Sequence, residues 1–150
     1  MTRVLALDQA TTTGIAVIED GKLIFHDKQT VEGEWEDKVN QIKKLMIDMI
    51  SDHSPDIVAI ENIQFQQNQD VYRKLAELKG VLENHLFDSE IDYRIVSPST
   101  WKSICGIKKQ GRDSEKKQAQ GFVEKIFDVK LSQDASDATC IAYSVWVKNK

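Results

Sequence analysis

The first 30 residues alternate between short apolar runs and turns. Residues 3 to 7, 14 to 18 and 22 to 26 are rich in Val, Ile and Leu, which is typical of strands. Asp20-Gly21 joins the second run to the third and is typical of a hairpin turn. The pattern predicts a meander of three strands.

From Glu34 onward the apolar residues repeat every three to four positions. This spacing predicts helices over residues 34 to 51 and 70 to 86, with one apolar stripe on each. Between them, the apolar run 57 to 60 predicts a strand buried on both faces that ends at Glu61.

The last third of the chain continues the alternation. A fifth strand is expected at 93 to 99 and a short helix from Pro98 to Trp101, with a loop at 106 to 113 and helices at 114 to 127 and 134 to 147. The order β-β-β-α-β-α-β-α-α predicts an α/β fold: a mixed five-stranded sheet with helices on both faces. We expect the first, fourth and fifth strands to lie parallel at its centre, in one domain spanning residues 1 to 150.

Composition limits the class of protein and the cellular compartment that we expect. The chain has 41% hydrophobic and 29% charged residues, which suits a globular domain with one core. Cys105 and Cys140 lack paired zinc-site spacing, so we expect buried, reduced thiols. No apolar run reaches the length of a membrane span, and we expect a cytoplasmic protein. The net charge of -4 disfavours nucleic-acid binding, but residues 108 to 117 hold five basic side chains in ten.

Four carboxylates occupy positions that suit a site. Asp8 and Glu61 end strands predicted to be parallel, so both are expected at the sheet edge where α/β proteins bind ligands. Asp134 and Asp137 are three residues apart and share one helical face. A simpler interpretation makes Asp134 the N-cap of the last helix, with Asp137 at its third position.

If the four carboxylates converge, a divalent cation with oxygen ligands would offset their repulsion. Mg²⁺, or Mn²⁺, fits better than zinc because His26, His53 and His85 are dispersed along the chain. Two such ions about 3.5 to 4 Å apart could support phosphodiester hydrolysis. The carboxylates therefore indicate a two-metal nuclease.

Several motifs resemble a known family. Through "LALDQATTTGIAV", "DIVAIENIQF", "KLAELKGV" and "QDASDATCIA", the sequence resembles RuvC-type Holliday junction resolvases of the ribonuclease H-like superfamily. The resemblance implies a homodimeric crossover junction endodeoxyribonuclease of DNA recombination and repair, which nicks two strands of a four-way junction symmetrically. It also implies that Asp8, Glu61, Asp134 and Asp137 are the catalytic metal ligands.

The resemblance assigns further roles. Lys102 and Lys116 match basic residues near the scissile phosphates, and the helix carrying Leu75, Leu78 and Leu82 matches the dimer helix. The apolar stripe over residues 71 to 86 would equally suit packing against the sheet. The family's base-stacking aromatic lies three residues after the strand-4 glutamate; that position is Gln64 here, and Phe65 is the candidate.

The basic residues between positions 108 and 117 and the short length of the chain lead to two further expectations. We expect Lys108, Lys109, Arg112, Lys116 and Lys117 to contact DNA phosphates. The short chain is similar to compact phage-encoded members of the family. Such members act without a motor partner, on a wider range of branched DNA, in the bacterial host cytoplasm.

Three alternatives stay open at this stage. One is a nuclease of the same fold that processes RNA or DNA flaps. Another is a phosphate-binding ATPase fragment of the actin and sugar-kinase type, because "DQATTTG" is similar to its "DxGTTxG" turn; Ala10 replaces the glycine that the turn needs, which makes the threonines plain turn and strand residues. The third, a DNA-binding module without activity, has no use for four carboxylates.

Overall fold

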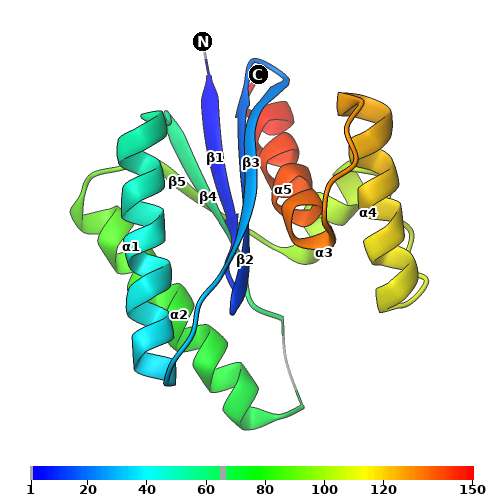
Figure 1. The fold of residues 1–150 in the computed structure, drawn as a ribbon. Helices are drawn as coiled ribbons and strands as arrows, with labels where there is room; N and C mark the ends of the chain where they lie inside the picture. Colours follow the sequence, from blue (N-terminus) through cyan, green and yellow to red (C-terminus); the bar gives the residue numbers. More distant parts are fainter. Residues whose placement is uncertain (1, 65–66) are drawn as a thin grey trace.

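The computed structural model describes residues 2 to 64 and 67 to 150, and its centre is a five-stranded sheet ordered β3-β2-β1-β4-β5 (Figure 1). The elements follow the expected order, with the short helix expected from Pro98 as a third helix after the last strand. They are β1 (Arg3–Asp8), β2 (Thr12–Glu19), β3 (Lys22–Thr30), α1 (Trp35–His53), β4 (Ile57–Glu61), α2 (Gln69–Asp88), β5 (Tyr93–Val96), α3 (Pro98–Ile104), α4 (Arg112–Phe127) and α5 (Gln133–Asn149).

The sheet is mixed, as predicted. Strand β1 pairs antiparallel with β2 and parallel with β4, and β4 pairs parallel with β5. The expectation that the fifth strand lies at the centre is wrong, because β5 is short and forms the edge of the sheet. The central strand is β1, so the residue that ends β1 lies in the middle of the sheet edge.

Side chains alternate between the two faces of the sheet and build two cores. Leu5 and Leu7 face α1 and α2, whereas Val4 and Ala6 face α5. In Figure 1, α1 and α2 cover one face, and α5, with α3 and α4 beside it, covers the other. Helix α5 is buried continuously from residue 135 to residue 142, which suits a helix enclosed between the sheet and other helices.

Small shifts separate the expected elements from the observed ones. The Asp20-Gly21 hairpin is confirmed, with φ of 49° and 83°. Strand β3 runs on to Thr30 because its second half still pairs with β2. Residues 112 and 113 belong to α4 rather than to a loop, since Gly111 is the N-cap and acidic residues occupy the first turn.

Two further expectations concern the cysteines and membrane-spanning segments. Cys105 and Cys140 are buried free thiols, as predicted. Among the described residues, no helix is long and apolar enough to cross a membrane.

Candidate active site

All four predicted carboxylates line one cleft of about 630 Å³ at the C-terminal edge of β1 and β4. Asp8 is the last residue of β1 and Glu61 the last of β4, and the two strands pair in parallel up to Leu7 and Ile60. Asp134 and Asp137 come from the first two turns of α5. Three elements distant in sequence therefore bring their carboxylates together, and we call these four residues the carboxylate cluster.

Gln9 fixes the spacing of the two strand ends. Its side-chain Nε2 donates to the Glu61 carbonyl at 2.7 Å, and its Oε1 accepts from the Glu61 N–H at 3.1 Å. One amide side chain thus continues the pairing of β1 with β4 by a further step, and it is itself buried. As a result, Asp8 and Glu61 have little freedom to move apart.

The start of α5 is held against the sheet by a close approach at Gly14. A Cβ placed on Gly14 would lie 2.0 Å from the Asp134 carbonyl oxygen, closer than any side chain allows. The simpler interpretation of Asp134 as N-cap is wrong, because the helix begins earlier and the Ser132 side chain accepts from the Ala135 N–H. The Asp134 carboxylate is therefore not used for capping.

Burial and mutual repulsion raise the pKa values of three members of the cluster. The pKa of Asp8 lies well above its ordinary value, first because of burial and then because of Glu61 and Asp137. Burial also raises the pKa of Glu61 and of Asp137. The ionised forms of these carboxylates are therefore destabilised, and a bound cation would stabilise them.

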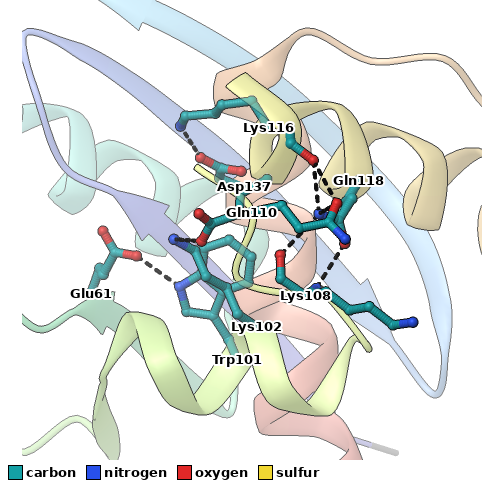
Figure 2. A network of polar contacts seen from close by, with 10 residues as sticks. Glu61, Trp101, Lys102, Lys108, Gln110, Lys116, Gln118 and Asp137 are labelled. Carbon is teal, nitrogen blue, oxygen red and sulfur yellow. Dashed lines mark hydrogen bonds and ion pairs between the residues drawn. The ribbon is translucent and has the colours of Figure 1, made fainter. Parts of the chain in front are cut away.

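Neighbouring side chains partly neutralise the cluster (Figure 2). The Lys116 ammonium pairs with Asp137, and the Trp101 indole donates to Glu61 Oε2 at 2.7 Å. Burial lowers the pKa of Lys116, but its attraction to Asp137, Asp8 and Asp134 outweighs this and raises it. In the described part of the chain, no three Asp, Glu, His or Cys side chains form a ready-made metal cluster. Glu61 and Asp137 are engaged with these protein donors instead.

The predicted basic residues divide into two groups. Lys102, Lys109, Arg112 and Lys116 line the cleft, whereas Lys108 and Lys117 are exposed and lie outside its lining. Lys102 lies 5.5 Å from the centre of the Trp101 ring and pairs with Glu115 at 3.2 Å. Phe65 lies outside the described residues.

Sequence reasoning missed several residues of the site. Gln9, Trp101 and Glu115 line the cleft, and Gln118 supports the segment that carries Lys109. The position of Trp101 could have been predicted. It is a large aromatic residue in a short helix that directly follows a strand, and such a residue lies near the edge of the sheet. A glutamine side chain that hydrogen-bonds to the backbone of a residue distant in sequence leaves no periodic pattern in the sequence.

The turn between β1 and β2 clarifies the role of the threonines. The Thr13 hydroxyl donates to the Ala10 carbonyl at 2.7 Å and closes the turn, and the Thr12 hydroxyl lies 3.0 Å from that of Thr30 across the strands. This is the plain turn and strand role expected of them.

The family model described as "Crossover junction endodeoxyribonuclease RuvC" matches residues 4 to 145. The chain belongs to the RuvC family. Curated RuvC proteins of Mycobacterium sp. strains KMS and JLS are 26% identical over 151 residues, covering 93% of this chain and 80% of theirs. As a RuvC-family member, the protein is a Holliday junction resolving endonuclease, and the ATPase alternative is set aside.

Solved structures confirm the RuvC fold. Thermus thermophilus RuvC in complex with a Holliday junction substrate aligns with a TM-score of 0.78 at 17% identity, over 95% of this chain and 92% of that one. The fowlpox virus resolvase, in complex with Holliday junction DNA, gives 0.69 at 14% identity over 99% of both chains. The yeast mitochondrial Holliday junction resolvase gives 0.62 at 15% identity, over 99% of this chain and 81% of that one.

Proposed function

We propose that this RuvC-family protein cleaves four-way DNA junctions by metal-dependent hydrolysis at Asp8, Glu61, Asp134 and Asp137. The observation that carries the proposal is the gathering of these four side chains, from three separate elements, in one cleft. A group of partly buried carboxylates destabilises the fold unless positive charge offsets it, and a cluster retained at that cost indicates a function. Binding a cation beside a DNA phosphate is such a function.

The donor set suits two Mg²⁺ ions, or Mn²⁺ in their place. It consists of carboxylate oxygens alone. Burial raises the pKa values of Asp8 and Asp137, so a bound cation would stabilise their ionised forms. When bound, two ions would activate the attacking water and stabilise the leaving oxygen. Asp8 is the shared ligand in this proposal, because it ends the strand beside β4 and pairs with Gly14, against which the start of α5 lies. Lys116 would turn from Asp137 toward a phosphate.

The residues around the cluster would bind the DNA. Lys102, Lys109, Arg112 and Lys116 add positive charge to the lining of the cleft, where DNA phosphates would neutralise it. Lys108 and Lys117 would reach phosphates farther from the cleft. That two structural relatives are complexes with Holliday junction DNA supports a branched substrate. Other branched DNAs belong to the same proposal, and so does base stacking by Phe65.

A homodimer would deliver two symmetric nicks. Leu78 and Leu82 do not form a dimer surface on α2, because both side chains are fully buried in the protein's own core. The outward side of α2 remains, where it borders a groove of about 690 Å³ with α1. We place a second copy there, and sedimentation equilibrium of the free protein tests it: a monomer at micromolar concentration would contradict this part of the proposal.

The assay compares three labelled substrates with and without Mg²⁺: a four-way junction, a linear duplex of matching sequence and a single-stranded RNA. The expected result is paired, metal-dependent nicks on opposite strands of the junction, with the duplex intact. We expect the same activity without a motor protein. We also expect the protein to act in the cytoplasm of a bacterial host. Cleavage of the RNA alone would contradict the proposal and favour the RNA-processing alternative. No cleavage with either Mg²⁺ or Mn²⁺ would contradict it as well.

A further inference from the structure

The segment between α3 and α4 carries positive charge into the cleft but has little regular structure of its own. We call residues 106 to 112 the basic segment. It starts at Gly106 and passes Gly111, both with positive φ (72° and 93°), and a Cβ on either glycine would meet nothing within 4 Å. Such a segment would sample many conformations unless other groups hold it. Its position therefore depends on a few specific contacts.

Gln118 supplies the central contact. Its side-chain Oε1 accepts from the Lys108 N–H at 2.7 Å, and its Nε2 donates to the Lys108 carbonyl at 2.9 Å (Figure 2). Both backbone groups of one residue are thus paired by a single amide on α4. Nε2 also lies 3.2 Å from Ser114 Oγ, which itself donates to Gln110 Oε1 at 3.0 Å.

A second contact holds the start of the segment. Ile107 is only 9% exposed and packs in the core beside α5, and its N–H donates to the Lys102 carbonyl at 2.8 Å. The backbone is therefore fixed at two consecutive positions, at Ile107 by this contact and at Lys108 by Gln118 of α4. Lys109, which lines the cleft, follows immediately.

Helix α4 contacts both the basic segment and the carboxylate cluster. Gln118 lies two residues after Lys116, whose ammonium pairs with Asp137. One stretch of α4 therefore holds the cluster with one side chain and the basic segment with another. Ordering a free segment on binding costs conformational entropy at each residue. Contacts that fix it beforehand reduce that cost.

We propose that Gln118 is a positioning residue for DNA binding, which holds the basic segment so that Lys109 and Arg112 face the DNA backbone across the cleft from the carboxylate cluster. This inference rests on the proposed function. It goes beyond it by assigning a role to a neutral side chain that has no place among the lining residues of the cleft.

The test replaces Gln118 by Leu, which removes both hydrogen bonds to Lys108 at similar volume. Gln120→Leu is the matched control, because Gln120 is on the same helix and its Nε2 donates to the Leu131 carbonyl at 2.9 Å instead. Junction affinity is measured by fluorescence anisotropy in EDTA at a series of salt concentrations. Rates at saturating junction are measured in Mg²⁺.

Gln118→Leu is expected to weaken junction binding about tenfold and to lower the slope of log affinity against log salt by about 1 to 2, the loss of one or two phosphate contacts. The rate at saturation is expected within about threefold of the wild type, since the carboxylate cluster is untouched. Gln120→Leu is expected to keep the wild-type slope. A purely structural role would lower the thermal stability of both variants and leave both slopes unchanged.

Two results would overturn the inference. One is a folded Gln118→Leu protein with the wild-type salt slope. The other needs no variant: in the wild type, amide exchange followed by NMR should show a protected Lys108 N–H beside a faster Lys109 N–H, and fast exchange at Lys108 would refute the contact. If wild-type protein neither binds nor cleaves the junction, the proposed function fails instead, which the same assay shows separately.

Discussion

Asp8 and Glu61 end two paired strands in the middle of the sheet. Lys109, in contrast, lies on a segment with two positive-φ glycines that is held mainly by one glutamine, and Arg112 is the first residue of the helix that follows. The first pair is fixed by the backbone ladder and by Gln9. The second is exposed and depends on side-chain contacts. The difference suits the two tasks that we propose for these residues: hydrolysis needs metal ligands placed to within a fraction of an ångström, while a phosphate contact tolerates adjustment.

Replacing Asp8 by Asn gives the largest effect. Cleavage of the junction is expected to fall by about 10³-fold or more, because a shared metal ligand contributes several kcal/mol of transition-state stabilisation. Junction binding is expected to stay equal or to strengthen, since a negative charge leaves the DNA surface. Cleavage rates and anisotropy measure the two effects. Loss of both, together with loss of fold by circular dichroism, would make Asp8 structural.

The sequence predicted the carboxylate cluster better than its surroundings. Asp8 and Glu61 follow apolar runs whose parallel pairing can be inferred, so their convergence at one edge was predictable. Asp134 was harder, because its closeness to the sheet depends on Gly14 and on capping by Ser132. Gln9 and Gln118 could not be predicted, since each pairs with the backbone of a residue that only the folded chain brings near.

Adding one methyl group at Gly14 comes next in size. Gly14→Ala would place a Cβ 2.0 Å from the Asp134 carbonyl, so the start of α5 must shift. We expect a loss of about 1 to 3 kcal/mol in the free energy of unfolding and about 100-fold in cleavage. Urea unfolding and the nicking assay measure them.

Gly121→Ala is the control, because a Cβ there meets nothing within 4 Å in the middle of α4. It is expected to stabilise the protein by about 0.5 to 1 kcal/mol. Equal behaviour of the two variants would show that the close approach at Gly14 has no importance.

Lys116→Met tests the neutralisation of the cluster. Without the ammonium, the buried Asp137 carboxylate loses its partner, and the metal-free protein is expected to lose about 1 to 3 kcal/mol of stability. Saturating Mg²⁺ should recover most of that loss, because a cation at the cluster replaces the missing charge. Thermal unfolding in EDTA and in Mg²⁺ measures it. Equal losses in both conditions would place Lys116 outside the electrostatics of the cluster.

The pH dependence of stability has a defined sign. Because the folded protein holds protons on Asp8, Glu61 and Asp137 more tightly than the unfolded chain does, the metal-free protein should lose stability as pH rises above about 4. Asp8→Asn should flatten this decline. Melting temperatures in EDTA at a series of pH values measure both, and stability that rises steadily with pH would contradict the account.

The smallest effect is expected in the basic residues. Lys109→Ala should weaken junction binding a few-fold and reduce the salt slope by about 1. Lys117→Ala, outside the lining of the cleft, should change the slope less. Anisotropy titrations in EDTA compare them. A larger change at Lys117 would move the DNA path to the outer face of α4.

Crystals grown with Mn²⁺ and a four-way junction would test the central claim most directly, through the anomalous scattering of the metal. The account predicts peaks enclosed by Asp8, Glu61, Asp134 and Asp137, with Asp8 beside both of two ions and Lys116 turned from Asp137 toward the DNA. Metal bound elsewhere, with the pair between Lys116 and Asp137 intact, would contradict it.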